Sequence, residues 1–149
     1  MAIALATVAN SIRGLTVTGL TIYDVDNIPA AVDTREKAAL VPLPDYITGM
    51  SVVRDSYGAA AAKMTITYTL NYRLFFKNAG AGRAGVIEYY DGMIDMVAAI
   101  WDAILAIATI TGAIDVMPTG VAGIGVVMDA ASNSFLGCDL AFQVQEFIN

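Results

Sequence analysis

The sequence predicts an α+β fold: a mostly antiparallel sheet with a long central hairpin, packed against one long amphipathic helix plus a short N-terminal helix. Residues 63–77 alternate apolar and polar side chains and are rich in Thr and aromatic residues, which is typical of a strand with one buried face. Residues 86–105 carry apolar side chains at helical spacing. Because helix, strands, helix and a final hairpin follow one another, the order favours α+β over alternating βα units.

The N-terminal segment predicts the short helix. Leu5, Val8 and Ile12 are spaced three and four residues apart, and Gly14 follows as a stop signal. We therefore expect an amphipathic helix over residues 4–13.

Shorter extended pieces are expected between this helix and the long alternating strand. A strand is predicted over residues 15–23, and Asp, Asn and Pro residues then predict a turn at 24–29. Residues 30–44 end with two prolines, which donate no hydrogen bond to a neighbouring strand, so we expect a short edge strand or an extended arm there. Residues 49–57 are the expected hairpin partner of residues 63–77.

The C-terminal part predicts the long helix and a last hairpin. Acidic residues lie opposite the apolar side chains of residues 86–105, so this helix is expected to pack on the apolar face of the sheet. Strands at 121–128 and 134–147 follow, joined by a turn at 129–133. The inward-facing residues of the last strand are expected to be Leu136, Cys138, Leu140, Phe142 and Val144.

The composition bounds the size and class of the protein. Its 149 residues have the length of one domain, so residues 1–149 are expected to form a single unit. Apolar residues make up 57% and charged residues 15%, which leaves apolar residues in surplus. Either Ala and Gly in the core account for the surplus, or contacts between subunits cover it. The most apolar stretch, residues 96–114, contains Asp102, which favours a buried helix over a membrane span.

Charge is distributed unevenly along the chain. The net charge of −6 disfavours binding of nucleic-acid phosphates. All eight Lys and Arg residues lie at or before Arg83 with six of the fourteen acids, a charge of +2, whereas the other eight acids follow Arg83 and give −8. Two unlike faces of this kind predict head-to-tail contacts between copies; the alternative is chance clustering of a few charges.

The sequence offers little chemistry for catalysis or metal binding. It has no His, which removes the usual general base and zinc ligand, and a single Cys, which excludes an internal disulfide. Cys138 is expected to be a small buried hydrophobe and not a nucleophile. We therefore expect no enzyme activity, no cofactor and no metal, and a reducing, cytoplasmic origin.

One motif points to a different function. Gly80, Gly82 and Gly85 spell GxGxxG between a strand and a helix, where a Rossmann fold places its dinucleotide-binding loop. However, the preceding strand alternates instead of being apolar throughout, and no βαβ unit follows. We interpret the segment as a small-residue connection that carries Arg83 towards a neighbouring subunit.

Five segments together carry a resemblance to a known family. They are LATVANSI at 5–12, GLTIYDVDNIPAAVD at 19–33, TYTLNYRLFF at 67–76, GAGR with the following YYDGMIDMVAAIWDAI helix between 80 and 104, and SFLGCDLAFQVQEF at 134–147. In these segments, which span nearly the whole chain, the sequence resembles the tail terminator (tail completion or neck) proteins of long-tailed bacteriophages.

This resemblance implies a structural virion protein that forms a ring, usually a hexamer, at the head-proximal end of the tail tube. There it ends tube polymerisation and provides the surface that joins the head. Its implied partners are copies of itself, the tail tube protein and a head-side neck or connector protein, while DNA passes through the lumen without specific binding. Assembly in the host cytoplasm is implied. The alternatives are another tail or neck component, such as a tail tube or connector subunit, and a soluble small-ligand-binding or enzymatic domain.

Opposite charges on neighbouring copies are expected to hold the ring together. The candidates for the subunit interface are Arg54, Arg73, Lys77 and Arg83 on one side and Glu88, Asp91 and Asp95 on the other. Tyr57 and the tyrosines at 68 and 72 are alternative interface anchors, although their pattern favours packing within the sheet. Asp91 and Asp95 share one helix face, where a solvated acidic stripe is commoner than an acid–base pair.

Overall fold

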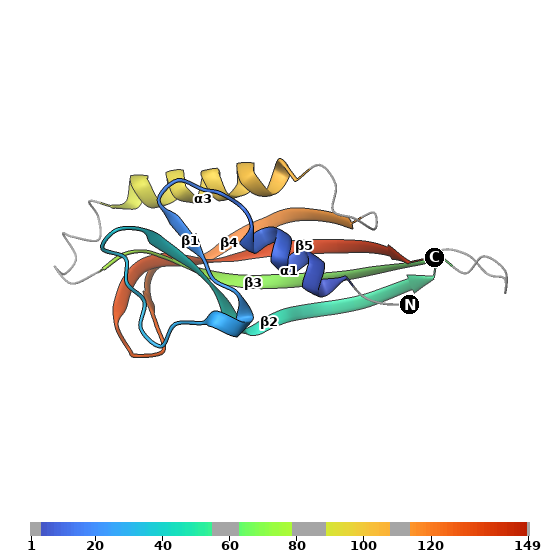
Figure 1. Cartoon of the computed structure of the whole chain (residues 1–149), viewed down its shortest axis with the longest axis horizontal. Coiled ribbons are helices and arrows are strands. Elements are labelled where there is room, and N and C mark those ends of the chain that lie inside the picture. The colour runs from blue at the N-terminus through green and yellow to red at the C-terminus, as the bar shows by residue number, and fades with distance from the viewer. Residues whose placement is uncertain (1–3, 55–62, 79–88, 108–113, 149) are drawn as a thin grey trace.

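The computed structural model describes residues 4–54, 63–78, 89–107 and 114–148, and it confirms the α+β class (Figure 1). In the described residues two α-helices lie on a curled five-stranded sheet with the strand order β1-β2-β3-β5-β4. Among the strand pairs of the described ranges, β1–β2 is parallel and the other three are antiparallel. The elements are α1 (Leu5–Arg13), β1 (Leu20–Ile22), the 3₁₀ turn η1 (Val25–Asn27), β2 (Ala38–Arg54), β3 (Met64–Asn78), α3 (Tyr90–Leu105), β4 (Ile114–Met128) and β5 (Ser134–Ile148).

The alternating segment forms β3, the central strand of the sheet. Its inward positions from Ile66 to Leu74 are buried every second residue, as the period of two predicts. The strand pairs antiparallel with β5 from Met64↔Ile148 to Asn78↔Phe135. On its other side it pairs with β2, which confirms the long hairpin.

The N-terminal strands differ from the sequence prediction. The strand expected over residues 15–23 is only three residues long, Leu20–Ile22. The expected arm at 30–44 and the expected strand at 49–57 join into one strand of 17 residues, β2. β1 covers only the first three residues of β2, so both prolines lie on its open edge, where no neighbouring strand needs their missing N–H. A register shift between Pro42 and Ile47 accommodates them against β3.

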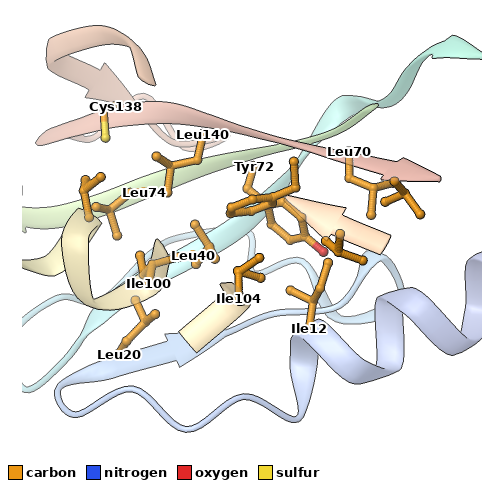
Figure 2. Packing of buried hydrophobic residues seen from close by; sticks show 14 of the residues in the cluster. Ile12, Leu20, Leu40, Leu70, Tyr72, Leu74, Ile100, Ile104, Cys138 and Leu140 are labelled. Carbon is orange, nitrogen blue, oxygen red and sulfur yellow. The ribbon is translucent and has the colours of Figure 1, made fainter. Parts of the chain in front are cut away.

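Both helices pack on the same face of the sheet and cover the main core. Val8 and Ile12 of α1 are buried, as are Met93, Val97, Ile100 and Ile104 of α3. Figure 2 shows Ile12, Ile100 and Ile104 gathered around the side chains of β3, among them Tyr72 and Leu74. Three apolar residues of the predicted helical pattern do not join the core, since Tyr89, Ile94 and Leu105 are 37%, 47% and 62% exposed.

The last two strands form the predicted hairpin. All five inward positions predicted for β5, from Leu136 to Val144, are buried, and Cys138 is fully buried. Burial raises the pKa of the Cys138 thiol to about 11, and the nearby Asp139 charge adds to the rise. β4 is longer than expected: it begins at Ile114 instead of residue 121 and passes Pro118 at a register shift against β5.

A second, smaller core lies on the opposite face of the sheet, at the end where β3 finishes. Its buried residues are Val32, Ala39, Val41, Phe75, Val127 and Phe135. The face opposite the helices was predicted to be polar, and over this end that prediction is wrong. The chain before β2 folds back here, and the backbone N–H of Val32 donates to Asp129 Oδ2 at 2.9 Å, which fixes the segment to the β4–β5 turn.

Candidate assembly surfaces

The notable features of the described residues are surfaces on which another protein could dock, and not sites for catalysis or metal binding. Among them no group of three or more His, Cys, Asp or Glu side chains could hold a metal ion. None of the helices in the described ranges is long and apolar enough to cross a membrane. The features that stand out are two open sheet edges, one uncovered sheet face and an apolar groove.

The first open edge belongs to β4, the last strand of the sheet on one side. Exposed apolar side chains recur along it, namely Met117, Ile124, Val126 and Met128, which are 45–60% exposed. Unpaired backbone groups beside apolar side chains form a template for another strand, which natural edge strands usually block with charges. On this strand Asp115 is a charged side chain at the start, and none follows it up to Met128.

The second open edge is that of β2 beyond Leu40, where β1 ends. It also carries exposed apolar side chains, since Met50, Val52 and Val53 are 49–59% exposed. Successive antiparallel pairings from β2 through β3 and β5 to β4 make β2 and β4 run in opposite directions. The β4 edge of one copy therefore matches the β2 edge of another copy for antiparallel pairing.

No described segment covers the sheet face opposite the helices over most of its length. We call it the open face and define it by Thr65, Thr67, Thr69 and Asn71 of β3 with the register partners Gln143 and Gln145 of β5. These side chains are uncharged. Arg73 is the next residue of β3 on this face after Asn71. Its guanidinium donates to both carboxylate oxygens of Asp139, at 2.7 and 3.1 Å.

The basic interface candidates do not form one patch. Arg54 pairs with Met64 at the start of β3, whereas Lys77 lies near its end, roughly 43 Å away at the rise of an extended strand. The hydrogen bond to Asp139 raises the pKa of Arg73, so this charge is balanced within the chain. Lys77 Nζ lies 5.9 Å from the ring centroid of Phe76.

The structure describes two of the three acidic interface candidates. Asp91 and Asp95 are exposed on α3, on the helix side that faces away from the sheet. Arg83 and Glu88 lie outside the described residues, as do the three glycines of the GxGxxG motif and Tyr57. Pairing of these charges between copies therefore stays a prediction.

The tyrosines of β3 are core residues, as their alternation favours. Tyr68 and Tyr72 are 0% and 2% exposed, and burial is the main cause that raises the pKa of each phenol. The Tyr72 hydroxyl lies 2.7 Å from that of Tyr46, and the two rings meet edge to face. They serve packing within the subunit, not an interface.

Two features were missed from the sequence. Glu146 lies at an inward position of β5 and is 2% exposed; continuing the period of two from Val144 would have found it. The second is a groove of about 280 Å³ on the open-face side of the sheet, lined by residues that include Ile28, Pro29 and Met128. It joins distant segments of the chain, so no local pattern signals it.

A comparison of the chain with protein-family models and with curated proteins found no match.

Proposed function

We propose that this protein is a structural subunit that assembles with copies of itself into a ring through the two open edges of its sheet. In this arrangement β4 of each copy pairs antiparallel with β2 of the next. Contacts between unlike surfaces close into a ring when the rotation between copies closes.

The observation that carries this proposal is the pair of long open edges. β2 and β4 are 17 and 15 residues long, β2 being open only beyond Leu40, and they run in opposite directions and carry exposed apolar side chains at two borders of one sheet. Their ends are level, because Val52, Ile66, Glu146 and Ile114 follow one another in register across the sheet. A rotation about an axis along the strands therefore brings matching lengths of edge together.

The resemblance to phage tail terminators gives the ring its proposed place. There the ring, a hexamer by this resemblance, sits at the head-proximal end of the tail tube, ends tube growth and receives the head-side neck or connector protein. A tail tube subunit is the second candidate, because the same edges would serve in stacked rings. Stacks of unlimited length in the electron microscope would favour the tube subunit, and single closed rings favour the terminator.

Charge placed on an edge tests the assembly. In Val126→Lys, 60% exposed on β4, an ammonium replaces an apolar edge side chain, so we expect rings to be lost while the subunit stays folded. Leu105→Lys on α3, 62% exposed, is the matched control and is expected to keep its rings. The measurement is negative-stain imaging with native mass spectrometry. Equal assembly of the two variants would contradict pairing at the β4 edge.

A further inference from the structure

The open face has a composition suited to burial. From Thr65 to Asn71 on β3, and at the partners Gln143 and Gln145 on β5, the outward side chains are hydroxyls and amides without charge. Two surfaces of this kind can come together and exchange hydrogen bonds. A charged side chain beside them is that of Asp115, the exposed β4 partner of Gln145 on the same face.

One end of this face carries an exposed apolar pair, which we call the tip. Val53 and Phe147 are both register partners of Thr65, so they flank it on the same face of the sheet. They are 59% and 51% exposed.

The other end of the same face carries the groove of about 280 Å³. The prolyl segment before β2 and the start of the β4–β5 turn border it, and Val41 and Phe75 contribute from the sheet. Ile28 and Met128 at its rim are 44% and 49% exposed. The groove is therefore open and mostly apolar, and Arg73 and Asp129 are its charged lining residues.

Tip and groove lie ten residues apart along β3, from Thr65 to Phe75, which is roughly 33 Å at the rise of an extended strand. Two copies stacked face to face with opposed strand directions thus place each tip over the other copy's groove. The four long strands β2, β3, β5 and β4, spaced by about 4.8 Å, give such an overlap roughly 600 Å² per copy, somewhat below the ~800 Å² of a standard stable interface.

We propose that a second copy of this chain docks on the open face in a two-fold dimer, with Phe147 of each copy seated in the groove of the other. The dimer leaves the backbone groups along the edges of β2 and β4 unpaired, so it does not depend on the ring, although Val53 and Met128 belong to both surfaces. One rotation satisfies both ends of the face at once, which is the property of a self-complementary interface.

Cysteine cross-linking tests the geometry. Phe147→Cys and Met128→Cys, alone and combined, are treated with a short bis-maleimide; Cys138 is fully buried and stays unreacted in the folded protein. The single variants are expected to give no cross-link, because their cysteines lie at far ends of the dimer. The double variant is expected to give a covalent dimer and nothing larger. A ladder of trimers and higher species would overturn the two-fold arrangement, and absence of any cross-link would overturn the docking.

A second experiment measures the reversible association of the two copies. Phe147→Asp at the tip and Ile28→Asp at the groove are each expected to raise the dimer dissociation constant by about tenfold or more in sedimentation velocity, because each buries a carboxylate against an apolar surface. Ile94→Asp on α3, 47% exposed and on the other side of the sheet, is the matched control and is expected to leave it unchanged. A dissociation constant that is the same in all three variants overturns the proposal. Ring formation is scored separately with the β4 edge variant.

Discussion

Glu146 brings a carboxylate into the core and ties both ends of the chain together. Its Oε1 accepts from the Tyr68 hydroxyl at 2.7 Å, and its Oε2 accepts from the backbone N–H of Ala4 at 3.0 Å. The Ala4 N–H stands at the beginning of α1, where the helix has unpaired donors and a positive partial charge. One side chain of β5 therefore anchors α1 to the central strand.

This anchor predicts how two substitutions will differ. In Glu146→Leu both donors lose their acceptor, so we expect the free energy of unfolding to fall by about 2–4 kcal/mol. In Glu146→Gln the amide oxygen can accept from Ala4 while its nitrogen donates to the Tyr68 oxygen, so the loss should stay below about 1 kcal/mol. Urea unfolding measures both values. Equal losses would show that the hydrogen bonds to Glu146 do not hold the helix.

Asp129 plays a comparable part in the β4–β5 turn. Its carboxylate accepts from the backbone N–H groups of Val32, Ala131 and Asn133. Desolvation raises the pKa of Asp129, but these backbone donors outweigh it, and its pKa lies below the ordinary value. The charged carboxylate of Asp129 thus stabilises the turn. This stabilisation is fully present above the ordinary carboxyl pKa, and it is lost as the pH falls through the lowered pKa of Asp129 in the folded protein.

At the scale of elements, what the sequence could predict depends on how local the signal is. β3, β5 and α3 follow from side-chain periodicity, which is a local property, and the buried positions of β5 agree residue by residue. β2 could not be predicted as one strand, because prolines argue against a strand unless its open edge is known. That edge exists only because β1 is short, which is a fact of sheet order and not of local sequence.

The same reason explains the outcome for the assembly surfaces. The subunit interface was predicted from charged residues, because charge is visible in the sequence. In the structure Arg73 already pairs with Asp139, and the basic candidates lie at opposite ends of β3. The groove and the second core unite segments from residue 28 to residue 135. Their existence depends on tertiary contacts that no periodicity in the sequence encodes.

The β3–β5 ladder predicts one intolerant glycine. A Cβ at Gly137 would overlap the carbonyl oxygen of Leu74 and lie 2.7 Å from a methyl group of Val127, so the two strands would have to separate. Gly137→Ala is expected to lower the free energy of unfolding by about 3 kcal/mol or more. Gly120→Ala on β4 is the matched control, since nothing lies within 4 Å of its Cβ position. Thermal and urea unfolding compare the two, and equal stabilities would refute the close packing at Gly137.

At the scale of the whole molecule, the one layer of helices in the described residues leaves three sides of the sheet uncovered by any other described segment over most of their length. The helices cover one face, the open face carries uncharged side chains, and the two edges carry exposed apolar ones. Lateral pairing of edges and stacking of faces are different directions of growth, so a single subunit can use both. This division of surfaces supports the proposed assembly.

The most direct measurement of the central claim is a cryo-electron microscopy reconstruction of the assembled particle at a resolution that shows strands. Our account predicts a closed ring with one continuous antiparallel sheet, in which β4 of every copy is hydrogen-bonded to β2 of the next. A ring whose copies touch only through α3, with the edges of β2 and β4 left in solvent, would contradict it.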